Sequence, residues 1–184
     1  HPRVGVLWPA LPALLAYDAV VMSGGTTTVF DSLSVGASMQ KQERRELFEP
    51  LVETLRAAVA QDLFRAQHLL HLRCEISDPA TPGLVDASVD FPETQLISVM
   101  DHTPGDRQSP DVDKWFWHMI RDMEVHEDEG RRMMEELFER SRTHGAAVRR
   151  HVTEAANAAN VPLMSHDDRT VAHVDEALAE GCTI

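Results

Sequence analysis

Short apolar runs that end near a histidine or a carboxylate recur along this 184-residue chain, and they constrain its fold most. The clearest run is Leu96–Met100, which precedes His102 and a Thr-Pro-Gly turn. Such a run predicts a buried strand that stops at the turn. Because alternate side chains of a strand share a face, His102 is expected on the side of Met100, at the carboxyl end of the strand. A lone histidine there is more often a surface residue, but two other strands of this chain end in a similar way.

Three further segments have the composition of strands. Thr26–Asp31 is rich in β-branched residues and is expected to end at Asp31, before a loop over 32–38. His68–Glu75 alternates, so that one face is apolar and the other carries His71, Arg73 and Glu75. Val161–His166 is the last of the three. Each of these strands therefore ends at a side chain that can ionise.

Helical segments separate the strands. The apolar spacing and the positions of Gly and Pro predict helices over Leu14–Met22, Glu43–Leu63, Asp111–Asn160 and Thr170–Glu180, and at most a short helix within Ser77–Thr94. Gly130 and Gly145 are expected to divide the long helical region, and a new strand is expected to start at Gly181. This alternation predicts an α/β fold of one domain over 1–184, with about four to five parallel strands and flanking helices.

Parallel strands end at one edge of a sheet, and that edge is where α/β folds place their sites. The prediction therefore gathers four side chains on one rim: Asp31, Glu75, His102 and His166. A carboxylate and two imidazoles are suitable ligands for a divalent metal such as zinc, manganese or iron, so Glu75, His102 and His166 are the candidate metal ligands. No HxxxH or CxxC spacing supports a metal, and the alternative is that these side chains pair with one another.

Cations near the same rim suggest an anionic substrate. Arg73, Arg107 and Gln108 are the candidate substrate-binding residues, since an arginine can grip an anion with a bidentate fork. The alternative for Arg73 is an ion pair with Glu75 or a neighbouring aspartate. Asp31, His71 and Asp167 are expected as hydrogen-bond partners that orient the metal ligands. Asp168 is expected to cap the helix that follows it.

The charge of the chain limits its partners. It has 30 acidic and 17 basic residues, a formal net charge of -13, which argues against nucleic acid or an anionic membrane as a general partner. A phosphorylated ligand stays possible, because a metal or a few arginines can reverse the field at one site. The two cysteines suggest no disulfide framework, and no apolar run is long enough to span a bilayer, so a cytoplasmic protein is expected.

Several motifs together resemble the PhnM proteins of phosphonate metabolism, which belong to the amidohydrolase superfamily. The most specific are Leu-Arg-Cys-Glu at 72–75 and Met-Asp-His-Thr-Pro-Gly at 100–105, followed by Arg107-Gln108. Thr26–Asp31 after Gly25, Ser-His-Asp-Asp at 165–168 and Pro2-Arg3 with Gly5 complete the set in the same order. Val4 and Asp106 depart from the family pattern.

This resemblance implies part of a (β/α)8 barrel of the amidohydrolase type, with one or two divalent metals at the carboxyl rim. It implies a hydrolase that converts a ribose 1-phosphonate 5-triphosphate into the 5-phosphate and diphosphate. By position, Glu75 resembles the bridging carboxylate ligand, His102 and His166 resemble the imidazole ligands of later strands, and Arg107 and Gln108 would lie near the substrate phosphates. The expected partner is a small phosphorylated sugar phosphonate.

The resemblance also leads us to expect a chain that is truncated at both ends. The family's first-strand His-x-Asp ligand pair would lie before His1, and its last-strand Asp, the expected general base, would lie beyond Ile184. No catalytic residue is therefore assigned within the chain. We expect little hydrolase activity from this chain alone, and open sheet edges that a second copy pairs or that the region Asp111–Asn160 covers.

Two alternatives stay open. One is another amidohydrolase-like metal hydrolase on the same scaffold. The other is a non-catalytic α/β binding domain, although 32–38 lacks the Gly-rich loop of a nucleotide-binding fold. Metal analysis would discriminate the metal hydrolases from the non-catalytic domain.

Overall fold

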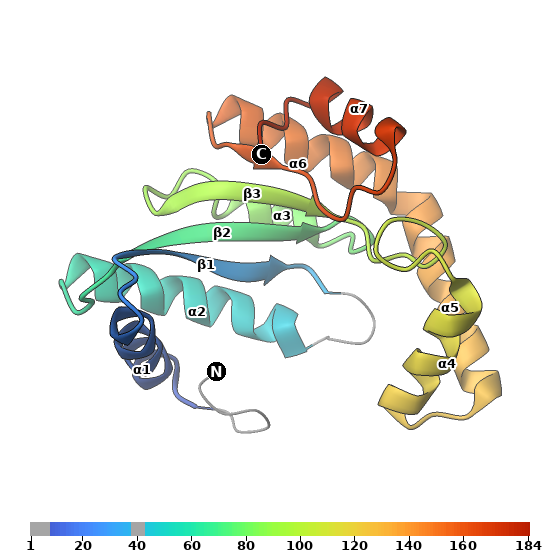
Figure 1. Cartoon of the computed structure of the whole chain (residues 1–184), viewed down its shortest axis with the longest axis horizontal. Coiled ribbons are helices and arrows are strands. Elements are labelled where there is room, and N and C mark those ends of the chain that lie inside the picture. Colours follow the sequence, from blue (N-terminus) through green and yellow to red (C-terminus); the bar gives the residue numbers. More distant parts are fainter. Residues whose placement is uncertain (1–7, 38–42) are drawn as a thin grey trace.

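The structure is a computed structural model that describes residues 8–37 and 43–184. Four strands form one parallel sheet in the order β1-β2-β3-β4 (Figure 1). They are β1 Thr28–Val35, β2 Gln67–Glu75, β3 Thr94–Met100 and β4 Leu163–Met164. Cys182 makes a single parallel bridge to Leu163, where the sequence predicts the start of another strand. The predicted α/β fold with parallel strands is therefore confirmed.

Helices connect the strands. They are α1 Ala10–Ser23, α2 Glu43–Ala60, α3 Thr81–Asp86, α4 Val112–Met123, α5 Glu127–Arg140, a π-helix over Ser141–Gly145, α6 Ala146–Ala158 and α7 Val171–Ala179. Helix α1 starts four residues earlier than predicted, because Pro12 lies in its first turn, where a proline costs no backbone hydrogen bond. None of the helices in the described ranges combines the length and the apolar character that crossing a membrane requires.

The hydrophobic core lies between one face of the sheet and helices α2, α3 and α6. The alternation of β2 directs Leu70, Leu72 and Cys74 into this core, and all three are fully buried. Ile97 and Val99 continue the same face on β3, next to Leu72 and Cys74 in the strand register. The opposite face of the sheet carries the polar side chains of β2. Because one face of the sheet is apolar and the other is polar, the strand register determines which face can carry a site.

The region Asp111–Asn160 is divided differently from the prediction. Helix α4 ends at Glu124, which has a left-handed φ of 54°, and Gly130 lies inside α5 instead of separating two helices. A Cβ at Gly130 would stand 2.3 Å from Cγ2 of Ile120, so the glycine lets α5 pack closely against α4. The resulting α4–α5 hairpin extends past the carboxyl ends of the strands (Figure 1).

Asp31 is not at the end of its strand, and this corrects the prediction that it lies on the rim. Strand β1 continues to Val35, because the polar residues after Asp31 pair with β2. The side chain of Asp31 lies on the helix-facing side, where its Oδ2 is 2.7 Å from Nδ1 of His68. Nε2 of His68 is 3.4 Å from Oδ1 of Asp18 on α1. Asp31 therefore belongs to a buried Asp-His-Asp cluster near the start of β2.

Asp18 attaches α1 to the sheet. It is fully buried and accepts hydrogen bonds from the backbone N–H groups of Arg65 and Ala66, at 3.0 and 2.9 Å. Burial alone would raise the pKa of Asp18, but these two N–H groups, His68 and the Arg65 side chain together lower it below 3.8. The charged form of Asp18 is thus the form that the fold stabilises.

We predict that Asp18→Asn destabilises the chain by about 3 kcal/mol at pH 7, because it removes one charge from a buried, hydrogen-bonded cluster. A carboxyl whose folded pKa is lowered contributes stability above its unfolded pKa, and this contribution is lost as the pH falls through the folded value. The difference between wild type and variant should therefore shrink below about pH 3.8. Urea unfolding at pH 7 and pH 3 measures it, with Glu53→Gln on the exposed side of α2 as control. An equal difference at both pH values would contradict the account.

Candidate functional site

Glu75 and His102 meet at the carboxyl end of the sheet. Glu75 is the last residue of β2 and is paired in register with Met100, the last residue of β3. His102 lies two residues beyond Met100 and so remains on the same face. Its Nδ1 is 2.5 Å from Oε2 of Glu75, whose other oxygen accepts from Ser77 Oγ at 2.9 Å. Glu75 is only 2% exposed, so this carboxylate is held in one position between two neighbouring elements.

His166 lies at the same end of the sheet, just after β4. Nη2 of Arg73 donates to Nε2 of His166 at 3.1 Å, and Nδ1 of His166 is 2.6 Å from Oδ2 of Asp167. A guanidinium can only donate, so Nε2 must accept and carries no proton. This arrangement places a ring proton of His166 on Nδ1, directed at Asp167. Asp167 thus stands where the sequence predicts a partner that orients His166.

The three candidate metal ligands approach one another without forming a closed ligand set. The rings of His102 and His166 are edge to face, with their centroids 6.4 Å apart. Glu75 is bonded to His102, whereas His166 is bonded to Arg73 and Asp167. Among the residues that the structure describes, no three His, Cys, Asp or Glu side chains stand in an arrangement that could hold a metal ion. Metal binding by these residues stays a prediction.

Ile184 marks the point beyond which the resemblance places the general base, and it is not itself a site residue. Its side chain is apolar and exposed. Its backbone carbonyl accepts a hydrogen bond from the N–H of Ser165 at 3.2 Å, and Thr183 donates to the carbonyl of Leu163 at 3.0 Å. The segment 182–184 therefore lies beside β4 and the start of the loop that carries His166. The place of the general base stays a prediction.

The predicted substrate-binding residues are in different environments. Arg107 is buried, and its guanidinium is engaged by Asp168 and Glu176, each at 2.5 Å. Gln108, the next residue, is exposed. Arg73 is half-buried, and within the described part of the chain no carboxylate pairs with it. Asp168 does not cap α7 as expected, since Thr170 accepts the hydrogen bond from the backbone N–H of His173.

A row of polar side chains crosses the sheet below the rim. Ser32 Oγ lies 2.9 Å from Nδ1 of His71, and Nε2 of His71 lies 2.9 Å from Oγ of Ser98. These residues come from β1, β2 and β3. His71 is hydrogen-bonded to these two serines, and its predicted role as a partner of the metal ligands stays a prediction. The row itself was missed by sequence reasoning.

His71 is a neutral imidazole in this row. Burial, the nearby Arg73 guanidinium and His166 together lower its pKa to about 4. Its cationic form is therefore disfavoured around neutral pH, and it links the two serines by hydrogen bonds.

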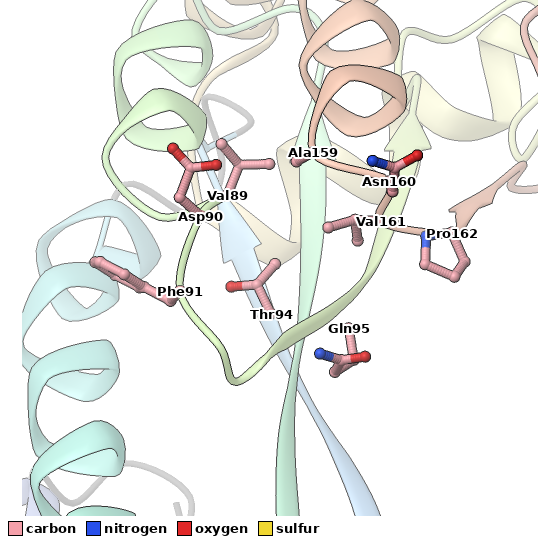
Figure 2. A pocket seen from close by; sticks show the side chains of 9 residues that line it. All are labelled: Val89, Asp90, Phe91, Thr94, Gln95, Ala159, Asn160, Val161 and Pro162. Atoms are coloured by element: carbon pink, nitrogen blue, oxygen red, sulfur yellow. The ribbon is translucent and has the colours of Figure 1, made fainter.

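A pocket lies at the other end of the sheet (Figure 2). Figure 2 shows that it is formed where the start of β3 faces the link between α6 and β4. Its lining comprises Val89, Asp90, Phe91, Thr94, Gln95, Ala159, Asn160, Val161 and Pro162. Asp90 is the one ionisable side chain in this lining, so the pocket offers little chemistry compared with the carboxyl end.

We predict that His71 makes folding stability depend on pH between about 6.5 and about 4. The unfolded chain takes up a proton on His71 in this range and the folded chain does not, so stability falls as the pH falls. The lowered pKa accounts for about 3 kcal/mol of this loss. Urea unfolding at pH 7 and pH 4.5 should show a weaker pH dependence for His71→Asn than for wild type. His118→Asn, at an exposed position on α4, is the control and should behave as wild type. Parallel pH profiles for His71→Asn and wild type would contradict the assignment.

Comparison with known proteins gives one informative similarity. The chain is 31% identical over 183 residues to the alpha-D-ribose 1-methylphosphonate 5-triphosphate diphosphatase of Escherichia coli (strain K12). The match covers 100% of this chain and 48% of that protein, so the chain spans about half the length of this relative. No family model matches the chain, and no solved structure matches it. The resemblance to the PhnM proteins that the motifs predict is therefore confirmed along the whole of this chain.

Proposed function

We propose that this chain carries metal-binding and phosphate-binding groups of a hydrolase of phosphonate metabolism, which releases diphosphate from a phosphorylated ribose phosphonate. The similarity to the E. coli diphosphatase supports the reaction class. The observation that carries the proposal is that Glu75, His102 and His166 meet at one end of a parallel sheet.

The donor chemistry of these residues fits a divalent metal. His166 presents an unprotonated Nε2 to the cationic guanidinium of Arg73, so its lone pair already faces a positive charge. Its Nδ1–H is directed at Asp167, an arrangement typical of metal-bound histidines. Nδ1 of His102 faces Glu75, so its other ring nitrogen, Nε2, would be the one to bind a metal. When bound, a metal would supply an acidified water as nucleophile.

Arg73 is the better candidate for binding a substrate phosphate. Its charge is not compensated by a carboxylate within the described residues, whereas Arg107 is engaged by two. The positive field of Arg73 is also one cause of the lowered pKa of His71. A guanidinium fork can bind a phosphate group through two N–H groups.

A buried hydroxyl next to His102 points to a further polar group at this site. Oγ1 of Thr103 has no hydrogen-bond partner among the described residues. Leaving such a group unpaired costs about 1–3 kcal/mol. A water or a substrate oxygen bound near His102 would remove this cost, which is consistent with a site that is completed by a ligand.

The architecture is consistent with an arc of a larger barrel, which we also propose. Four parallel strands follow one another in chain order, and helices α2, α3 and α6 pack on one face. In (β/α)8 barrels the helices cover the outer face of the sheet, the other face is the inner face of the barrel, and sites lie at the carboxyl ends of the strands. The polar face of β2 corresponds to that inner face.

Metal titration tests the proposal most directly. We predict that Zn²⁺ binds to the chain and that Glu75→Gln and His102→Asn each weaken binding at least about tenfold, because each removes a ligand. Isothermal titration calorimetry measures the affinities, and His118→Asn on α4 is the control. Equal affinities for wild type and both variants, or no binding by wild type, would contradict the metal site.

The reaction requires a separate measurement. Because this chain spans about half of its relative, diphosphate release from ribose 1-methylphosphonate 5-triphosphate should be compared between this chain and a version extended at both ends. Glu75→Gln in the active version should lower the rate by about 10² or more. Undiminished release by that variant would contradict the role of Glu75.

A further inference from the structure

Arg107 connects three elements of the carboxyl end. It lies in the loop after β3 and is 5% exposed. Its Nη1 donates to Oδ1 of Asp168, and its Nη2 donates to Oε2 of Glu176, both at 2.5 Å. Asp168 belongs to the loop after β4, and Glu176 is on α7. One buried guanidinium therefore ties the β3 loop, the β4 loop and α7 together.

The β4 loop carries His166, and Arg107 contacts this loop at that histidine and after it. Besides its bond to Asp168, Nη1 of Arg107 donates to the backbone carbonyl of His166 at 3.4 Å. Oδ2 of Asp168 in turn accepts from Oγ of Ser165 at 2.5 Å. The contact is reciprocal, because Arg169 donates to the carbonyl of Arg107 at 3.4 Å. The backbone of 165–169 is thus fixed by contacts that centre on Arg107.

Each of these two loops contains one residue with a strained backbone. Asp167 has a φ of 57° and Arg107 a φ of 31°, both in the left-handed region that residues other than glycine disfavour. Such conformations cost about 1–3 kcal/mol each and persist only where surrounding contacts impose them. At Asp167 the strained turn brings the carboxylate to Nδ1 of His166, 2.6 Å away. The strain is therefore located where the orientation of His166 is set.

We propose that Arg107 is a positioning residue, which acts through Asp168 and the His166 carbonyl to present the unprotonated Nε2 of His166 at the rim. This role differs from the substrate contact that the sequence predicts for Arg107. The positioning role depends on the proposed function only for the identity of the ligand that His166 binds. The orientation of His166 is a property of the chain itself and can be measured without a ligand.

The chain offers a matched control in Arg149 on α6. Its side chain is 11% exposed and donates to Glu180 at 2.6 and 2.8 Å, and it pairs with Glu176 at 3.2 Å. Arg149 therefore resembles Arg107 in burial, in carboxylate partners and in its attachment to α7. Within the described residues, its hydrogen bonds and ion pairs are to Glu176 and Glu180 and not to the loop that carries His166. Removing either guanidinium should cost similar stability, but only Arg107 should affect His166.

The first measurement is the tautomer of His166, from the ring nitrogens in ¹⁵N-edited NMR spectra of the 184-residue chain at pH 8. Wild type and Arg149→Gln should show His166 protonated on Nδ1 alone. Arg107→Gln should show a mixture of both neutral tautomers, because the loop no longer holds Asp167 against Nδ1. Arg107→Lys keeps the positive charge but loses the two-pronged guanidinium. It should give a tautomer mixture between those of wild type and Arg107→Gln. The wild-type tautomer in a folded Arg107→Gln chain would overturn the proposal.

The second measurement is Zn²⁺ affinity by calorimetry. Arg107→Gln should weaken binding about 10–100-fold, as expected when support of a metal ligand is lost, while Arg149→Gln should bind as wild type does. Equal weakening by both variants would show a general loss of stability and overturn the positioning role. If wild type binds no Zn²⁺, the proposed function fails, and the tautomer decides the role of Arg107 by itself.

Discussion

The buried polar side of β2 is the constraint on which this arrangement depends. His71, Arg73 and Glu75 share one face of a central strand, and desolvated groups of this kind are costly unless they are paired. Each finds its partner on a strand or loop beyond β2: His71 on β1 and β3, Arg73 after β4, and Glu75 after β3. The need to satisfy these three side chains therefore brings several strand ends together. The same pairing that stabilises the sheet assembles the candidate site.

The two faces of the sheet use similar residues for different purposes. On the helix side, His68 lies between Asp18 and Asp31, fully enclosed, and the cluster joins α1 to the sheet. At the carboxyl end, His102 and Glu75 form a comparable pair, but the side chain of His102 is 27% exposed. A carboxylate and an imidazole in contact are therefore not sufficient to indicate a site. Access to solvent and the convergence of a second imidazole distinguish the carboxyl end from the cluster at Asp18.

The alternation of side chains along the strands was sufficient to predict most of the candidate site. It placed Glu75 on the polar face of β2 and His102 on the face of Met100, and the structure shows them in contact. Asp31 was misplaced because the residues after it look like a loop, while pairing with β2 extends β1 to Val35. Gly130 was misread for a related reason. A glycine in a helical pattern suggests a break, but here it provides close packing against α4. Neither long-range contact is visible in local sequence.

The two arginines at the rim show why a motif alone could not assign their roles. Arg73 lies near the end of β2 and Arg107 follows β3, and both are cations in a chain with a formal net charge of -13. Arg107 has two carboxylate partners and is buried, so its charge is neutralised within the protein. Arg73 donates to a ring nitrogen of His166 and not to a carboxylate within the described residues, so its charge remains available to an anion. Whether each arginine is paired with carboxylates depends on loops that are far apart in sequence. This pairing therefore distinguishes Arg107, which positions the site, from Arg73, which can bind a ligand.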